Sequence, residues 1–228
     1  MTLKVAIASF AHVHAGSYAH LLASLPGIDV LSADPDGAGA PDPGPRGAEF
    51  AAQFGIPYVD SYDELFAWGP DAVVVTSENA GHRELVERAA AVGAHVLCEK
   101  PLATEVADGE AMLAACEAAG TILMIAYPVR FAPSYAQLRA NVEAGRLGDV
   151  FAVLGTNNGK IPYAARQWFT DAKLAGGGAL DDELLRTVGE SLRGVGVVVG
   201  RANIDGVHGP RFAVASGLVH LCATASRS

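Results

Sequence analysis

The tripeptide Glu99-Lys100-Pro101 is the part of the sequence that most clearly indicates chemistry. It follows the apolar run 96–98, which is typical of a buried strand. Charged groups at the end of such a strand are costly to bury, and open α/β sheets bind their ligands at that edge. A lysine there can hold a cofactor amide or a substrate oxygen, or transfer a proton. A solvated ion pair at the strand end is the alternative interpretation.

The first predicted strand-to-helix turn, residues 9–16, is a candidate dinucleotide contact. Glycines at three positions of such a turn let backbone N–H groups approach a pyrophosphate. Ser9, Ala11 and His14 occupy those positions here, so the match is poor and an ordinary turn is the alternative. His12 and His14 alternate as metal ligands do. Without a third ligand nearby in the sequence, two polar loop histidines are the simpler interpretation.

Asp34 stands at the end of the second predicted strand, followed by the Pro- and Gly-rich loop 34–47. A carboxylate at this place accepts a hydrogen bond from a ribose 2′-hydroxyl and repels a 2′-phosphate, which favours NAD over NADP. Asp36 competes for the same role, and an ordinary loop carboxylate is the alternative.

The elements that would position these residues follow an α/β pattern. The first 126 residues alternate short apolar runs with helical periods, which predicts a doubly wound parallel sheet. The expected strands are 4–9, 28–33, 58–59, 71–76, 95–98 and 121–126, and the expected helices are 16–25, 48–54, 82–92 and 108–119, with Gly93 and Gly120 as helix caps. A helix at 133–144, a strand at 149–155 and an irregular stretch at 157–174 predict a partial α+β second domain over residues 127–228.

Composition narrows the class of protein. Half of the 228 residues are hydrophobic and 18% are charged, which excludes a disordered chain. A net charge of −9 without a basic run argues against nucleic acid or an anionic membrane surface as partner. Cys98, Cys116 and Cys222 show no disulfide or zinc spacing, so we expect a cytoplasmic protein.

The runs 71–76 and 91–103, with His82 between them, resemble the glucose–fructose oxidoreductase / inositol dehydrogenase / MocA (Gfo/Idh/MocA) family. Further similarity at Arg130-Phe131, 145–148 and 168–180 extends the resemblance over residues 3–182. The resemblance implies a Rossmann domain (1–126) followed by an α+β domain. It also implies NAD, with NADP as an option, and hydride transfer to or from a sugar, inositol or related polyol. Lys100 would lie beside the nicotinamide and the substrate.

The resemblance further implies a catalytic aspartate and, four residues later, a histidine. Asp182 matches the aspartate, but Arg186 occupies the histidine position. Arginine stays protonated and cannot accept a hydroxyl proton. Either Lys100 acts, helped by Asp182, or the reaction is impaired.

The candidate residues form three groups. The predicted cofactor-binding residues are Ser9, Phe10, Ala11, His12, His14, Asp34, Thr76, Ser77, Asn79, His82, Glu99 and Lys100. The predicted catalytic residues are Lys100 and Asp182, and the predicted substrate-binding residues are Arg130, Asn157, Trp168 and Arg186. No metal site is predicted, and a homo-oligomer is left open.

The similarity stops near residue 183. One hypothesis is a truncated or frame-altered family member whose residues 183–228 do not form the family sheet, and the other is a short, divergent subfamily. Two further alternatives to an active oxidoreductase stay open. One is a non-catalytic dinucleotide- or sugar-binding protein, favoured by Arg186 and the degenerate glycine turn, and the other is an unstable fragment.

Overall fold

The computed structural model describes residues 2–40, 44–148, 152–159, 166–176, 196–199 and 215–224. The chain divides into two compact units. The first comprises Met1–Ala126 and Pro162–Gly177, and the second comprises Tyr127–Ile161 and Gly178–Ser228. No helix among the described residues is both long and apolar enough to span a bilayer.

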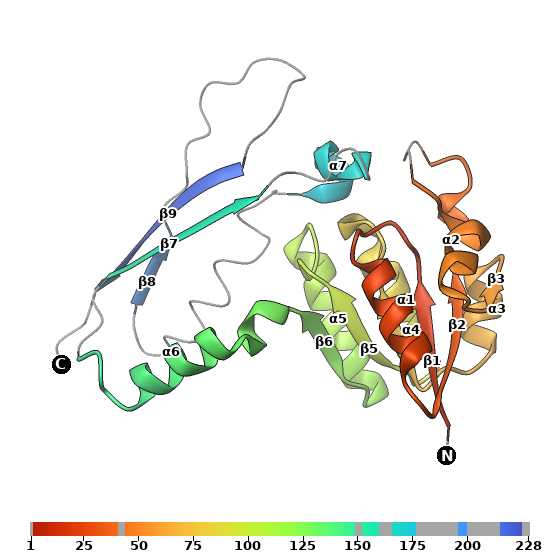
Figure 1. The fold of residues 1–228 in the computed structure, drawn as a ribbon, viewed down its shortest axis with the longest axis horizontal. Coiled ribbons are helices and arrows are strands. Elements are labelled where there is room, and N and C mark those ends of the chain that lie inside the picture. Colours follow the sequence, from red (N-terminus) through yellow and green to blue (C-terminus); the bar gives the residue numbers. More distant parts are fainter. Residues whose placement is uncertain are drawn as a thin grey trace. The chain divides into compact units, whose positions relative to one another are not determined.

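The first unit is built on a parallel six-stranded sheet in the order β3-β2-β1-β4-β5-β6 (Figure 1). Its strands are β1 (Leu3–Ala8), β2 (Ile28–Ala33), β3 (Tyr58–Val59), β4 (Ala72–Val75), β5 (His95–Glu99) and β6 (Leu123–Ala126). Val5 of β1 pairs with Val30 on one side and Ala72 on the other, so the chain reverses its direction of travel across the sheet at β1. This order is that of the doubly wound dinucleotide-binding fold, which confirms the predicted fold class.

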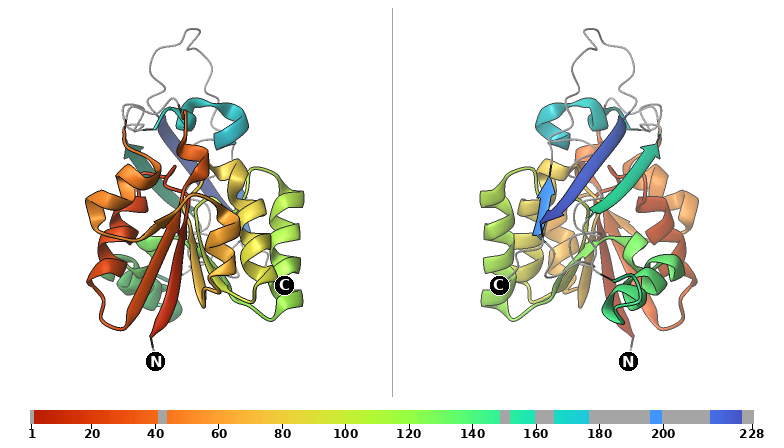
Figure 2. Two further views of the ribbon diagram at one scale, coloured as in Figure 1. Left: turned by 90° about the vertical axis from the view of Figure 1, so that its right-hand side faces the viewer. Right: turned by 90° about the vertical axis from the view of Figure 1, so that its left-hand side faces the viewer.

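Helices cover both faces of this sheet (Figure 2). Ile7 packs with residues of α1 (Ala15–Ser24) and α2 (Gly47–Phe54) on one face. Val73 and Val75 pack with residues of α3 (Tyr62–Ala67), α4 (His82–Ala91) and α5 (Val106–Ala119) on the other. Successive side chains of a strand point to opposite faces, and strands buried on both faces have continuous apolar sequences. That is why runs such as 71–76 are apolar throughout.

Local signals set the ends of several helices. The Ser61 side chain accepts a hydrogen bond from the Glu64 N–H and begins α3. Gly93 and Gly120 follow α4 and α5 with left-handed φ angles of 78° and 68°, as expected for residues that end a helix.

Parts of the stretch 157–174, predicted to be irregular, form regular secondary structure. Strand β7 extends from Ala152 to Gly159, and the 3₁₀ helix η4 (Gln167–Thr170) and helix α7 (Ala172–Ala175) follow within the first unit. Asp171 caps α7 by accepting a hydrogen bond from the Lys173 N–H. A four-residue helix set by one cap is too short to show a helical period, so the prediction was wrong there.

The second unit contains a helical part and an antiparallel sheet. The helical part is η3 (Pro128–Phe131) and α6 (Pro133–Glu143), and the sheet order is β7-β9-β8. Strands β8 (Gly196–Val199) and β9 (Ala215–Thr224) both come from the part of the chain in which the similarity to the family had ended. Thr156 of β7 pairs with Leu218 of β9, and Cys222 of β9 pairs with Val198 of β8.

Candidate functional site

The predicted cofactor residues of the first unit gather at the carboxyl edge of the parallel sheet. Ser9, Asp34, Thr76 and Lys100 directly follow β1, β2, β4 and β5. The first three are fully or almost fully buried, and Lys100 is 7% exposed. Because the strands are parallel, their carboxyl ends meet at one edge. Residues far apart in the sequence therefore form one polar surface.

Ser9 shapes the turn that follows β1. Its φ of 72° lies in the left-handed region. Glycine adopts this conformation without strain, whereas a serine needs other contacts to hold it there. The Ser9 hydroxyl accepts a hydrogen bond from the Ala11 N–H at 3.2 Å and donates to Asp34 Oδ1 at 3.1 Å. The Thr76 hydroxyl donates to the Ser9 carbonyl at 2.5 Å, and the Thr76 carbonyl accepts from the His12 N–H. Hydrogen bonds from side chains and from the end of β4 thus hold the turn in a conformation that glycines would adopt without strain.

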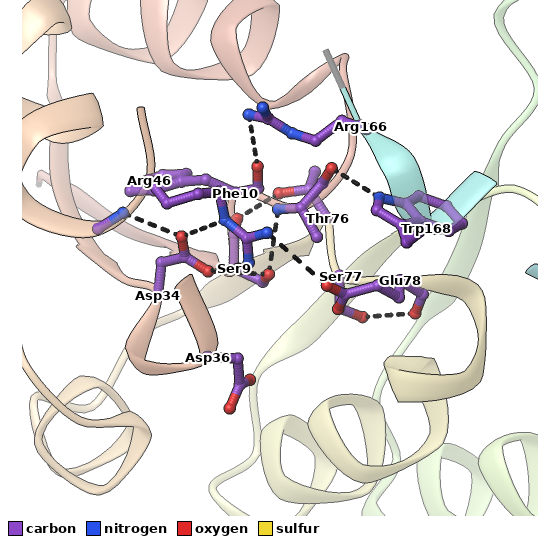
Figure 3. A network of polar contacts seen from close by, with 12 residues as sticks. Ser9, Phe10, Asp34, Asp36, Arg46, Thr76, Ser77, Glu78, Arg166 and Trp168 are labelled. Atoms are coloured by element: carbon purple, nitrogen blue, oxygen red, sulfur yellow. Dashed lines mark hydrogen bonds and ion pairs between the residues drawn. The ribbon is translucent and has the colours of Figure 1, made fainter. Parts of the chain in front are cut away.

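Asp34 is paired with Arg46, a residue that the sequence analysis did not single out (Figure 3). Arg46 Nε donates to Asp34 Oδ2 at 2.7 Å and Arg46 Nη2 donates to Oδ1 at 2.8 Å. The Gly47 N–H and the Ser9 hydroxyl donate to the same carboxylate. Four hydrogen bonds fill the acceptor positions of a carboxylate. A ribose hydroxyl would have to replace one of these donors, and the ribose contact of Asp34 stays a prediction.

Arg46 also approaches Glu78, which follows β4, with Nη1 3.7 Å from Oε1. Burial raises the pKa of Glu78, and the guanidinium opposes that shift. A Cβ at Gly37 would lie 2.5 Å from Asp34 Oδ2, so this position of the loop requires glycine. Asp36, the predicted competitor of Asp34, is exposed and accepts a hydrogen bond from the Tyr62 hydroxyl.

A second polar cluster surrounds Glu99, which is 1% exposed. His14 Nδ1 and the Tyr18 hydroxyl each donate to Glu99 Oε1 at 2.9 Å, and the Lys100 N–H donates to Oε2 at 3.1 Å. His12 Nδ1 lies 3.9 Å from Oε2. Burial alone raises the pKa of Glu99, but the hydrogen bonds from His14 and Tyr18 and the nearby imidazoles lower it to about 2. The carboxylate is therefore ionised at neutral pH.

The two buried histidines near this cluster are held neutral. Burial lowers the pKa of His12 to about 3, against the opposing attraction of Glu99. Burial likewise lowers the pKa of His82. His82 Nδ1 donates to the Pro101 carbonyl at 2.9 Å, which ties the start of α4 to the cis Lys100–Pro101 peptide. His82 thus acts as a positioning residue for the segment that carries Lys100.

The segment 166–176 packs against the same turn. Arg166 Nη2 donates to the Phe10 carbonyl at 3.1 Å, and Trp168 Nε1 donates to the Ala11 carbonyl at 2.9 Å (Figure 3). The Asn79 side-chain amide, in the 3₁₀ helix η2 (Asn79–Gly81), donates to the Ala175 carbonyl at 2.8 Å. These contacts attach a distant part of the chain to the candidate cofactor turn.

The comparison with known families decides the classification. A profile described as the oxidoreductase family with an NAD-binding Rossmann fold matches residues 10–127, more than half of the chain. The chain belongs to this family. A second profile, the diol dehydratase reactivase ATPase-like domain, matches residues 167–222, which is too small a part of the chain to show membership.

Related proteins match part of this chain and less than half of their own length. The chain is 37% identical over 138 residues to D-xylose 1-dehydrogenase (NADP(+)) 2 of Haloferax volcanii, covering 60% of this chain and 42% of that protein. It is 43% identical over 90 residues to the myo-inositol dehydrogenase Hyg17 of Streptomyces leeuwenhoekii, covering 40% of this chain and 28% of that protein. The matches thus span less than half of these relatives.

Solved structures of the family resemble a larger share of the chain. An aldose-aldose oxidoreductase from Caulobacter crescentus, complexed with glycerol, superposes with a TM-score of 0.66 at 31% identity. The superposition covers 87% of this chain and 60% of that one. An oxidoreductase from Agrobacterium radiobacter, in complex with NAD⁺, L-tartaric acid and magnesium, gives a TM-score of 0.71 at 25% identity. It covers 90% of this chain and 59% of that one.

The structure says less about the predicted substrate-binding residues and about the predicted catalytic residue Asp182. Trp168, predicted to bind substrate, is 4% exposed and stacks on Phe169 with ring centroids 4.0 Å apart. Arg130 is exposed in η3, and Asn157 lies in β7, where it pairs with Gly217. Asp182 and Arg186 lie outside the described residues.

The sequence did not single out two arginines, Arg46 and Arg166, that contact residues of the candidate site. Arg46 had a signal, because it is the sole basic residue in the acidic, Pro- and Gly-rich loop 34–47. Arg166 had no signal, because nothing in its local sequence indicates a contact with Phe10, 156 residues away.

Proposed function

We propose that the chain binds NAD or NADP at the carboxyl edge of its parallel sheet and transfers hydride between the nicotinamide and a hydroxyl or carbonyl group of a sugar, inositol or related polyol. The observation that carries this proposal is the buried Glu99-Lys100 pair at the end of β5, beside the β1–α1 turn of an NAD-binding Rossmann fold. The names of the relatives, xylose and inositol dehydrogenases, support the substrate class.

The residues at this edge fit a dinucleotide. Helix α1 has no acidic residue in its first turn and no capping side chain, so its N-terminus suits a phosphate group. His14, at the N-cap, is half-buried and adds an imidazole there. The bound nicotinamide would supply hydride chemistry, and the protein supplies position and electrostatics.

Lys100 is the residue proposed to exchange a proton with the reacting hydroxyl. Loss of hydride from a carbinol carbon requires that the hydroxyl proton be accepted. Lys100 is buried, and its backbone is fixed by the hydrogen bond from its own N–H to Glu99 and by the segment that His82 holds. Asp182 is proposed to assist, as the similarity to the family implies.

The test combines nucleotide binding with turnover. NADH and NADPH are titrated by fluorescence, and NAD- or NADP-dependent oxidation is assayed over a panel of sugars and polyols. We expect Lys100→Met to lower kcat by about 100-fold or more while nucleotide affinity changes little. The exposed Lys173→Met is the matched control. Failure of the wild-type chain to bind either nucleotide would overturn the proposal.

A non-catalytic dinucleotide- or sugar-binding protein is the second candidate. The N–H groups of Ala11, His12 and His14 already donate to Ser9 Oγ, the Thr76 carbonyl and His12 Nδ1. This arrangement leaves the turn fewer donors for a pyrophosphate. Nucleotide binding without turnover over the whole panel would select this candidate.

Two further expectations stay predictions. The buried thiols of Cys98 and Cys116 are free, which supports a reducing compartment such as the cytoplasm. A homo-oligomer formed through the β7-β9-β8 sheet is the assembly to test by light scattering.

A further inference from the structure

We propose that His12, His14 and Glu99 form a binding site for a divalent transition metal ion of the zinc class. Each residue offers one ligand atom, and these atoms all lie within 4.8 Å of one another. The sequence alone left two loop histidines without a third ligand. The fold supplies it, because the end of β5 brings Glu99 against the β1–α1 turn from 85 residues away.

The distances suit a tetrahedral ion. His14 Nδ1 lies 2.9 Å from Glu99 Oε1, and His12 Nδ1 lies 3.9 Å from Oε2. Zinc–nitrogen and zinc–oxygen bonds of about 2.0–2.1 Å place tetrahedral ligand atoms about 3.3 Å apart. The His14 Nδ1–Oε1 distance is shorter than that value, and the His12 Nδ1–Oε2 distance, to the other carboxylate oxygen, is longer. The ligand atoms lie within 4.8 Å of one another, so side-chain rotations would be needed to bring one atom of each residue onto one ion.

The proposed ligand atom of His12 already takes part in a hydrogen bond. His12 Nδ1 accepts a long, 3.2 Å hydrogen bond from the His14 N–H, so its lone pair points at that backbone group. A metal ion would take over this lone pair, and would also replace the proton that His14 Nδ1 shares with Glu99. The two imidazole rings already lie side by side, edge to face with centroids 4.5 Å apart.

Neighbouring groups hold the ligands in place. The Tyr18 hydroxyl and the Lys100 N–H orient the Glu99 carboxylate, and outer hydrogen bonds of this kind strengthen metal sites. The His12 ring is 1% exposed and packs within 5.5 Å of the Phe169 ring, measured between centroids. Two imidazoles and one carboxylate favour Zn²⁺, Co²⁺ or Ni²⁺ over Mg²⁺ or Ca²⁺. Three protein ligands leave one tetrahedral position for water or an exogenous ligand.

The experiment uses the full chain without an affinity tag and without nucleotide. Co²⁺ is titrated while its visible d–d absorption is recorded, and Zn²⁺ is then added to displace it. We expect one equivalent of Co²⁺ to give a tetrahedral spectrum, stoichiometric displacement by Zn²⁺, and no displacement by excess Mg²⁺. Absence of the spectrum at one equivalent overturns the proposal.

Variants locate the ion. His14→Gln, at a half-buried position, is expected to lower Co²⁺ affinity at least 30-fold, and Tyr18→Phe, which removes an orienting group, about tenfold. His20→Gln, on the exposed face of α1, is the matched control and should bind as the wild type does. Equal affinity of His14→Gln and His20→Gln overturns the assignment to this cluster. Because nucleotide is absent, the result is independent of whether the chain binds NAD.

Discussion

Two buried carboxylates at the same edge of the sheet are stabilised in different ways. Asp34 is held by the guanidinium of Arg46, which stays charged at any ordinary pH, and all its acceptor positions are filled. Glu99 is held by imidazole and hydroxyl groups, and His12 beside it has a buried Nε2 without a partner among the described residues. The first cluster is fixed, because it ties Arg46 and Gly47 to Asp34 through a pair that stays charged. The second consists of imidazole, hydroxyl and carboxylate groups, which are the types of group that bind metal ions or take part in proton transfer.

The largest expected effect comes from breaking the fixed pair. Arg46→Met leaves Asp34 buried and uncompensated, so we expect the free energy of unfolding to fall by about 3–5 kcal/mol in urea denaturation. The double variant Asp34→Asn/Arg46→Met removes both charges and should recover much of that loss. Arg83→Met, which breaks exposed ion pairs with Glu87 and Asp108, is the control, and its free energy of unfolding should stay close to that of the wild type because exposed pairs contribute little. Similar losses in Arg46→Met and Arg83→Met would contradict the buried-pair interpretation.

The cluster around Glu99 should tolerate the loss of its carboxylate charge better than the cluster around Asp34 tolerates the loss of Arg46. Glu99→Gln keeps one oxygen acceptor but turns an amide group toward donors such as His14 and Tyr18. We expect a loss of about 1.5–3 kcal/mol at pH 7, the value typical of hydrogen bonds to charged groups, which is smaller than that of Arg46→Met. Differential scanning calorimetry alongside denaturation checks this order. A loss larger than that of Arg46→Met would reverse the comparison between the clusters.

The buried neutral histidines predict how stability depends on pH. Burial lowers the pKa of His82 below the unfolded value near 6.5, so below that pH the unfolded chain binds a proton that the folded chain does not. Stability is therefore full above pH 6.5 and falls as the pH drops. In the range below about pH 6.5 stability increases with pH, with a slope of at most about 1.4 kcal/mol per pH unit from one such group. His82→Gln should reduce the measured slope in this range, and an unchanged slope would contradict the prediction.

The sequence predicted the parts of this site that follow from periodicity and from the geometry of parallel sheets. Asp34, Thr76 and Lys100 end apolar runs, and the carboxyl ends of those runs share one edge. The pairing of Asp34 with Arg46 was not predictable, because a guanidinium that reaches back across an irregular loop leaves no period. The contact of His14 with Glu99 depends on packing between elements 85 residues apart, and no local pattern records it.

Ser9 offers the smallest and most specific test of the fixed cluster. Its left-handed φ costs about 1–2 kcal/mol in a non-glycine residue, while its hydroxyl contributes hydrogen bonds to Asp34 and Ala11 worth a similar amount. Ser9→Gly relieves the strain but loses the hydroxyl, so its free energy of unfolding should lie within about 1 kcal/mol of the wild type. Ser9→Ala loses the hydroxyl and keeps the strain, and it should be about 1–2 kcal/mol less stable than Ser9→Gly in matched urea titrations. Equal stability of the two variants would mean that residue 9 relaxes to an ordinary φ once the hydroxyl is gone. The left-handed conformation of Ser9 would then be imposed by its hydrogen bonds with Asp34 and Thr76, and not by the geometry of the turn itself.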